Sequence, residues 1–415
     1  MGFLENAYKL LSGKGLSRLN DNVASLSQGI FQECLRIKVR SIEIIVYCFV
    51  YENFRIYSLP WDSPFTWYLC LIGIDFGFYW AHRFAHEVNI IWAIHQAHHS
   101  AEDFVMTSAL RQALLQPFTA WLTYVPLALF IPPSIFLAHL QLGELYMFWL
   151  HTEIIHKLGP LEYILNTPSH HRVHHGRNAK YIDKNFGGTF IIWDRIFGTF
   201  EPEDPEEPAV YGLVHPVQSY NPFYLQLHHW GAMWSKMRTM QGWRNKVNVF
   251  FMGPGWEPGK PRLGLISDIP KIEYPVVPWD PQIHLIEKVY VIWHFALTVI
   301  FYHELTLRHG SFSQFVVTCS ILSLIYSITS LGFILEGRWF APLFELLRCL
   351  LFFGVEQWLL PVVQPLEHLG AYRLTAVYAI RMSFLVSAIA SSIYSLHKVA
   401  VKCNISPKSL QIKKE

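Results

Sequence analysis

Residues 75–87 read D-F-G-F-Y-W-A-H-R-F-A-H-E, an apolar stretch that leads directly into two histidines four positions apart. Two further clusters follow, H-Q-A-H-H at 95–99 and H-R-V-H-H at 171–175. Positions i, i+3 and i+4 share one face of a helix, so each cluster can direct two or three imidazoles at one point. Eight imidazoles are too many for one metal ion and suit two, and they predict a metalloenzyme. They belong to His82, His86, His95, His98, His99, His171, His174 and His175.

The composition predicts an all-α integral membrane protein, built as a transmembrane helix bundle. Hydrophobic residues make up 52% of the 415 residues and charged residues only 15%, whereas soluble domains carry about a quarter charged residues. The net charge of +2 provides no broad basic field for nucleic acid. The six cysteines, at 34, 48, 70, 319, 349 and 403, show no C-x-x-C spacing. We therefore expect reduced or buried thiols and no disulfide framework.

Polarity divides the chain into four expected parts. These are a cytosolic amphipathic N-terminal segment (1–40), a catalytic domain with membrane hairpins and a cytosolic cap (41–280), C-terminal transmembrane helices (281–400) and a cytosolic tail (401–415). The apolar runs of the catalytic domain are short for full spans, since about 20 residues cross a bilayer. They are expected to tilt, or to enter and return as hairpins at the turns 60–64 and 131–134.

The distribution of basic residues predicts the orientation. Most lysines and arginines lie in the N-terminal segment, in 82–112, in 152–280 and in the C-terminal tail. The positive-inside rule assigns these segments to the cytosol, which places all three histidine clusters on the same side of the membrane. The first thirty residues lack the apolar core of a cleavable signal peptide, so we expect insertion through internal spans.

Four more residues are candidates for the site. His151 directly follows an apolar run, as His82 does, and is a plausible ninth ligand. Asp75 and Glu144 lie seven residues before these two histidines, on the same helical face, and are candidate acceptors that orient ligand imidazoles. An equally weighted alternative is that both carboxylates are partly hydrated and pair with Arg83 or another cation. Glu87 directly follows His86.

The donor set narrows the choice of metal without settling it. Structural zinc sites are closed by four ligands, often including cysteine, and no cysteine lies near a cluster. Eight or nine nitrogens leave coordination positions open on two ions, which suits oxygen activation by iron. Iron and zinc both remain open on this argument.

The order and spacing of the clusters among apolar runs resemble the fatty acid hydroxylase superfamily of integral-membrane di-iron enzymes, which includes sterol desaturases and lipid hydroxylases. The surrounding sequence is similar to the alkylglycerol monooxygenase family within it. The segments that carry this resemblance, besides 75–87, are W-D-S-P at 61–64, H-Q-A-H-H-S at 95–100, N-T-P-S-H-H-R-V-H-H-G-R-N at 166–178, I-I-W-D-R-I-F-G-T-F at 191–200 and G-P-G-W-E-P-G-K-P-R-L-G at 253–264.

The resemblance implies that the eight clustered histidines bind metal and that Glu87 is functionally required. It implies two ferrous ions, O2, tetrahydrobiopterin and a multi-pass protein of the endoplasmic reticulum membrane whose active site faces the cytosol. The implied reaction hydroxylates the ether-linked alkyl carbon of 1-O-alkylglycerols or lyso-alkyl phospholipids, giving a fatty aldehyde and a glycerol derivative. The family pattern starts with an additional apolar segment, so a shorter form with one span fewer is expected here.

Two rival functions remain open on the sequence. One is another lipid hydroxylase or desaturase of the same superfamily, acting on a sterol or a fatty acyl chain with cytochrome b5 as the electron donor. The other is a non-enzymatic, zinc-bound membrane protein. The sequence contains no recognisable pterin motif and no glycine-rich nucleotide-binding pattern.

Overall fold

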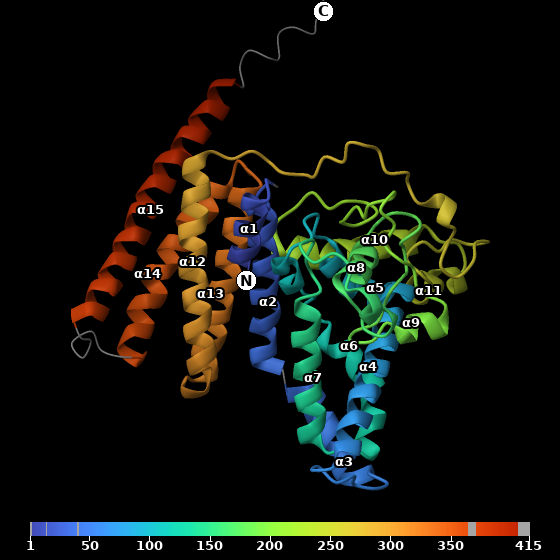
Figure 1. Cartoon of the computed structure of the whole chain (residues 1–415). Helices are drawn as coiled ribbons and strands as arrows, with labels where there is room; N and C mark the ends of the chain where they lie inside the picture. Colours follow the sequence, from blue (N-terminus) through green and yellow to red (C-terminus); the bar gives the residue numbers. More distant parts are fainter. Residues whose placement is uncertain (1, 14, 40, 364–370, 406–415) are drawn as a thin grey trace, which may run out of the picture. The chain divides into compact units, whose positions relative to one another are not determined.

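The computed structural model describes residues 2–13, 15–39, 41–363 and 371–405. Within them the fold is all-helical, as predicted, and β-pairing is limited to two isolated bridges. The chain forms two compact units (Figure 1): residues 1–218 with 222–280, and residues 219–221 with 281–415. The five cysteines with described side chains are free, as expected, whereas the Cys403 side chain lies outside the described set.

Four helices of the first unit form an apolar projection: α3 (Ser41–Phe54), α4 (Pro64–Glu87), α6 (Pro117–Tyr124) and α7 (Pro133–Phe148). Proline at the first turn starts α4, α6 and α7, where its missing N–H costs no hydrogen bond. The turn after α3 meets the turn before α7, since the Ile56 N–H donates to the Leu129 carbonyl at 2.9 Å. These helices therefore interlock as two helix–turn–helix segments with adjoining tips.

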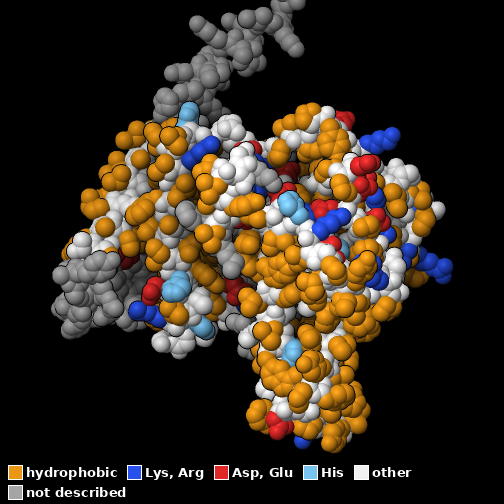
Figure 2. Space-filling view, in the orientation of Figure 1, with side chains coloured by type: hydrophobic (Ala, Val, Ile, Leu, Met, Phe, Trp, Pro, Cys, Tyr) orange, Lys and Arg blue, Asp and Glu red, His pale blue; other side chains and the backbone are white. Residues whose placement is uncertain are grey.

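Small residues allow these helices to pack closely. A Cβ atom at Gly77 of α4 would lie 2.9 Å from the Tyr124 ring. Between α3 and α7, the rings of Tyr47 and Phe136 stack at 3.9 Å. The outer surface of the projection is covered by hydrophobic side chains (Figure 2), with Leu122 and Leu145 more than 60% exposed. Such a surface is expected to face lipid.

The remaining elements of the first unit form a cap around the upper end of α4. They are α1 (Gly2–Leu11), α2 (Leu19–Val39), α5 (Asn89–His99), η1 (Met106–Leu110), η3 (Gly159–Tyr163), α8 (Pro168–His175), α9 (Ile192–Phe197), α10 (Pro222–Thr239), α11 (Trp243–Phe251) and η4 (Ile266–Asp268). The short helix η2 (Val125–Leu129) does not belong to the cap, because it follows α6 in the projection. Helix α5 packs against α10 and α11 around Ala93, Met233 and Val249. Helix α2 buries Ala24 and Phe31 and packs on η1. The predicted N-terminal segment is thus packed into the first unit.

The second unit is a helical bundle of α12 (Leu285–Arg308), α13 (Gln314–Leu335), α14 (Ala341–Val363) and α15 (Ala371–Ile405), with η5 (His309–Ser311) between the first two. Three of its helices are long and apolar enough to cross a bilayer, at Leu285–Ser311, Gln314–Leu335 and Thr375–Leu396. The chain is therefore a multi-pass membrane protein. Most of the predicted tail, 401–415, lies outside the described residues.

One buried ion pair joins the helices of this bundle. Arg348 donates to Glu345, one turn away on α14, and also to the ring of His294 on α12. The Glu345 Oε2 atom, which accepts from Arg348 Nε, also accepts from the Ser330 hydroxyl of α13 at 2.8 Å. Because charges in a bilayer are costly unless paired, these contacts fix how the three helices register against one another.

Candidate metal centre

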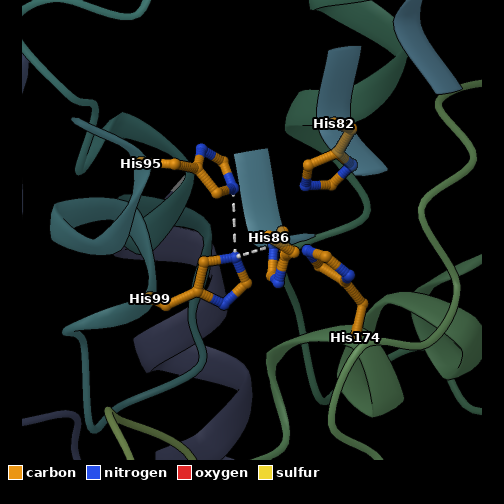
Figure 3. Close-up of side chains that lie close together, drawn as sticks. All are labelled: His82, His86, His95, His99 and His174. Carbon is orange, nitrogen blue, oxygen red and sulfur yellow. Dashed lines mark hydrogen bonds between the residues drawn. The ribbon is translucent and has the colours of Figure 1, made fainter. Parts of the chain in front are cut away.

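All nine predicted histidines are buried and come together in two groups. The first group contains His82, His86, His95, His99 and His174 (Figure 3), and the second contains His98, His151, His171 and His175. Within each group, one ring nitrogen from every residue lies within 4.8 Å of those of all the others. Each group is therefore dense enough to surround a single ion.

Three helices and one loop position these rings. Helix α4 supplies His82 and His86 as it leaves the apolar projection, α5 and α8 supply the other two sequence clusters, and His151 follows the end of α7. Adjacent residues project about 100° apart on a helix. His98 and His99 therefore point into different groups, and His174 and His175 divide in the same way.

Backbone carbonyls determine which nitrogen is available in four of the nine rings. The Nδ1–H groups of His82 and His174 donate to the carbonyls of Phe186 and Lys184, both at 2.9 Å. In the second group, the Nδ1–H of His98 donates to the Arg111 carbonyl at 2.9 Å. A carbonyl can only accept, so Nδ1 carries the proton and Nε2 presents a lone pair.

Within each group, the lone pairs of neighbouring rings point toward one another. The Nε2 atoms of His98 and His151 lie 3.3 Å apart, although both Nδ1 atoms donate to carbonyls, of Arg111 and Met147. Two acceptors cannot form a hydrogen bond, so this arrangement needs a cation. Nitrogens about 2.1 Å from a metal ion lie about 3.0 to 3.4 Å from their neighbours on a tetrahedral or octahedral shell. The donor set therefore fits a bound transition metal.

The first group shows the same spacing. The Nε2 atom of His99 lies 3.1 Å from that of His86 and 3.2 Å from that of His95 (Figure 3). The Nε2 atom of His174 is buried and has no hydrogen-bond partner among the described residues. A buried nitrogen without a partner is costly, and coordination of a metal ion would satisfy it.

Burial keeps the imidazoles in the form that binds metal. It lowers the pKa of all nine rings, and brings the pKa of His82 and of His98 to about 4. Neutral imidazole is the ligand form, so both groups are ready to coordinate near neutral pH.

Residues 183–194 support the first group, and the sequence analysis did not identify this role. Asp194 accepts hydrogen bonds from the backbone N–H groups of Phe186 and Gly187 at 2.7 and 2.8 Å. Asp183 and Asn185 adopt positive φ angles of 57° and 56°, a conformation that Asp and Asn tolerate better than most residues. The resulting turn directs the carbonyls of residues 184 and 186 at the histidines. The sequence feature that could have indicated this turn is the Asp and Asn pair in D-K-N-F-G-G.

Asp75 and Glu144 do not orient histidines, contrary to our first interpretation. The acceptor for His82 is the Phe186 carbonyl. The Asp75 carboxylate instead accepts from the backbone of Thr189 and Phe190 and from the Trp193 indole. The exposed Glu144 carboxylate pairs with Arg36 at 3.2 Å, as the alternative of pairing with a cation predicted for it. A helical offset of seven identifies a shared face but cannot identify which neighbouring chain covers that face.

Asp75 nevertheless supports the loop that carries the Phe186 carbonyl. Replacement by asparagine would turn an amide N–H₂ group toward donors, and an unsatisfied buried group costs about 1–3 kcal/mol. We expect Asp75→Asn to lower thermal stability and to reduce metal content, with a smaller effect than loss of a ligand. Unchanged unfolding temperature and unchanged metal content would contradict this role. Glu144→Gln, which alters an exposed pair, is the matched control.

Glu87 anchors α4 to a distant segment. Its carboxylate accepts from Arg83 at 2.7 Å, one turn earlier, and from Arg262 at 3.3 Å. Arg262 lies in the segment 253–264 that also carried the sequence resemblance. The structure therefore places Glu87 beside the first group, next to His86, and pairs it with two arginines.

Comparisons with known proteins agree with this centre. A family model described as fatty acid hydroxylase matches residues 67–199, which contain all nine histidines, and one described as the alkylglycerol monooxygenase C-terminal domain matches residues 287–369. A search of the solved structures gives no significant match.

Several curated relatives are similar over most of the chain. The chain is 50% identical to an alkylglycerol monooxygenase of Homo sapiens, over 83% of this chain and 77% of the relative. It is 38% identical to one of Caenorhabditis elegans, over 85% and 72%. Similarity to an ornithine lipid hydroxylase of Rhizobium tropici, at 32%, covers only 36% and 45%. With its two buried groups of convergent imidazoles, the chain belongs to the alkylglycerol monooxygenase family of oxidoreductases.

Proposed function

We propose that this protein is a di-iron monooxygenase that uses O2 and tetrahydrobiopterin to hydroxylate the ether-linked alkyl carbon of 1-O-alkylglycerols and lyso-alkyl phospholipids. The observation that carries the proposal is the convergence of nine imidazoles in two buried groups. Relatives named alkylglycerol monooxygenase, 38–50% identical to the chain, support the choice of substrate.

The proposed metal ligands are the members of the two groups. The five imidazoles of the first group would together hold one ferrous ion, and the four imidazoles of the second group would hold the other. Bound iron supplies the activation of O2, a chemistry for which nitrogen donors are suited. The protein contributes neutral rings in fixed orientations and a buried environment that keeps bulk water away from the reaction.

The proposed co-substrates supply the oxygen atom and the electrons that the overall reaction needs. One oxygen atom of O2 enters the C–H bond next to the ether oxygen. The other leaves as water, with two electrons and two protons from tetrahydrobiopterin, which is oxidised to a dihydropterin. The hydroxylated carbon is then a hemiacetal carbon. The hemiacetal collapses to a fatty aldehyde and a free glycerol hydroxyl, which breaks the ether bond.

The proposed substrate orientation follows the apolar projection. The alkyl chain would lie along α3, α4, α6 and α7, and its polar head would lie near the upper end of α4, where the first group begins. Burial of each methylene contributes about 0.8 kcal/mol, which selects long chains. We further propose that the cap faces the cytosol and that the membrane is that of the endoplasmic reticulum.

The decisive experiment combines an activity assay with metal analysis of the purified full-length chain. We expect aldehyde formation from an alkylglycerol to require both O2 and tetrahydrobiopterin, with about two iron ions per chain. Dependence on NADH and cytochrome b5 instead would assign the protein to another lipid hydroxylase or desaturase type. Bound zinc with no oxygen-dependent turnover would refute the enzyme proposal.

A further inference from the structure

Helices α1 and α2 contact the segments that carry the second group of histidines. The clearest connection is Arg111, whose side chain is almost completely buried. Its guanidinium donates to the Asp21 carboxylate and to the Ser25 hydroxyl, both on α2. The backbone carbonyl of this same arginine accepts the Nδ1–H of His98. A side chain anchored on α2 therefore holds the acceptor that orients a candidate metal ligand.

A second connection runs through Glu5 of α1. This carboxylate is buried, and one oxygen accepts from the Met106 backbone N–H at 2.8 Å. The other oxygen accepts from the Thr152 hydroxyl at 2.7 Å. Thr152 directly follows His151, another member of the second group. One carboxylate thus ties the segment after α5 to the loop after α7.

The first group has a different support. Its Nδ1 acceptors, the carbonyls of Lys184 and Phe186, belong to the turn held by Asp194. The second group instead uses the Arg111 carbonyl for His98 and is braced by two carboxylates, Asp21 and Glu5, that lie outside the histidine-bearing segments. The two groups can therefore be disturbed separately.

We infer that α1 and α2 position the ligands of the second ion, through the Asp21–Arg111 pair and through Glu5. Residues 1–39 lie outside the region matched by the fatty acid hydroxylase model, so this support is added to the histidine core. The inference rests on the proposed two-metal function. Asp21 and Glu5 are positioning residues, because each acts through Arg111, Met106 or Thr152.

The test is the metal content of purified full-length variants, measured by mass spectrometry. Asp21→Asn keeps Arg111 itself but leaves its buried guanidinium without an anion. The Arg111 carbonyl is then no longer held in position for His98. We expect the content to fall from about two ions per chain to about one. Glu5→Gln should act in the same direction. Glu33→Gln is the matched control, because Glu33 also lies on α2 but pairs with Arg36, one turn away, in a partly exposed pair. This variant should retain both ions.

Double variants identify which ion is lost. In a His98→Ala background, Asp21→Asn should cause no further loss, since both changes release the same ion. In a His82→Ala background, Asp21→Asn should remove the ion that remains. Thermal unfolding and size-exclusion profiles of each protein establish that it is folded, and if Asp21→Asn does not fold, Glu5→Gln decides the question in the same backgrounds.

The other outcomes are equally informative. Two ions retained in folded Asp21→Asn and Glu5→Gln would overturn the inference, and so would loss of both ions from a folded single variant. A wild-type protein that binds fewer than two ions would instead refute the proposed function, before any variant is compared.

Discussion

His98→Ala and His174→Ala are each expected to abolish turnover by removing different ions. His98 belongs to the second group and His174 to the first, and both present Nε2 because Nδ1 is bonded to a carbonyl. Loss of a partner that merely orients a ligand costs about 10–100-fold in metal affinity or activity, so loss of a ligand should cost at least about 100-fold. Each variant should retain about one ion per chain.

A histidine outside both groups provides the control for these variants. His228 lies on α10, and its Nδ1 bonds to the Tyr224 carbonyl one turn earlier. His228→Ala should keep near-normal turnover and both ions. The ligand assignment would be wrong if either His98→Ala or His174→Ala kept near-normal activity, or if both lost the same ion.

Asp194→Ala is expected to release the first ion and to destabilise the cap. The Asp194 carboxylate accepts from the backbone N–H groups of Phe186 and Gly187 and from the Thr199 hydroxyl. Each buried donor left without a partner costs about 1–3 kcal/mol, so the two N–H groups alone amount to about 2–6 kcal/mol. Displacement of the Phe186 carbonyl would also free His82. Metal content and the free energy of unfolding are the measurements.

Two further variants are compared with Asp194→Ala. Asp194→Asn keeps one accepting oxygen and should have an intermediate effect. Asp204→Asn alters a carboxylate that pairs with Lys180 at the surface of the same cap, and it should leave metal content unchanged. Full retention of the first ion in a folded Asp194→Ala protein would show that the 183–194 turn does not position His82.

The sequence predicted the all-helical membrane class because composition and apolar run length depend little on tertiary contacts. Helical periodicity also placed the residues of each cluster on a common face, and His151 was found because it follows an apolar run. The assignments of Asp75 and Glu144 as acceptors for histidines were wrong because they depended on tertiary contacts. Periodicity identifies a face, whereas the partner of a side chain on that face comes from a segment far away in the sequence.

The sequence by itself therefore determined the kinds of donor, their helical spacing and the membrane setting. Only the tertiary structure decided that His98 and His99 serve different groups, because the division depends on how α4, α5 and α8 meet in space. It also decided which nitrogen is available in His82, His98, His151 and His174, because the acceptors for Nδ1 in these rings are backbone carbonyls. Every residue has such a carbonyl, so its position, and not its residue type, creates the site.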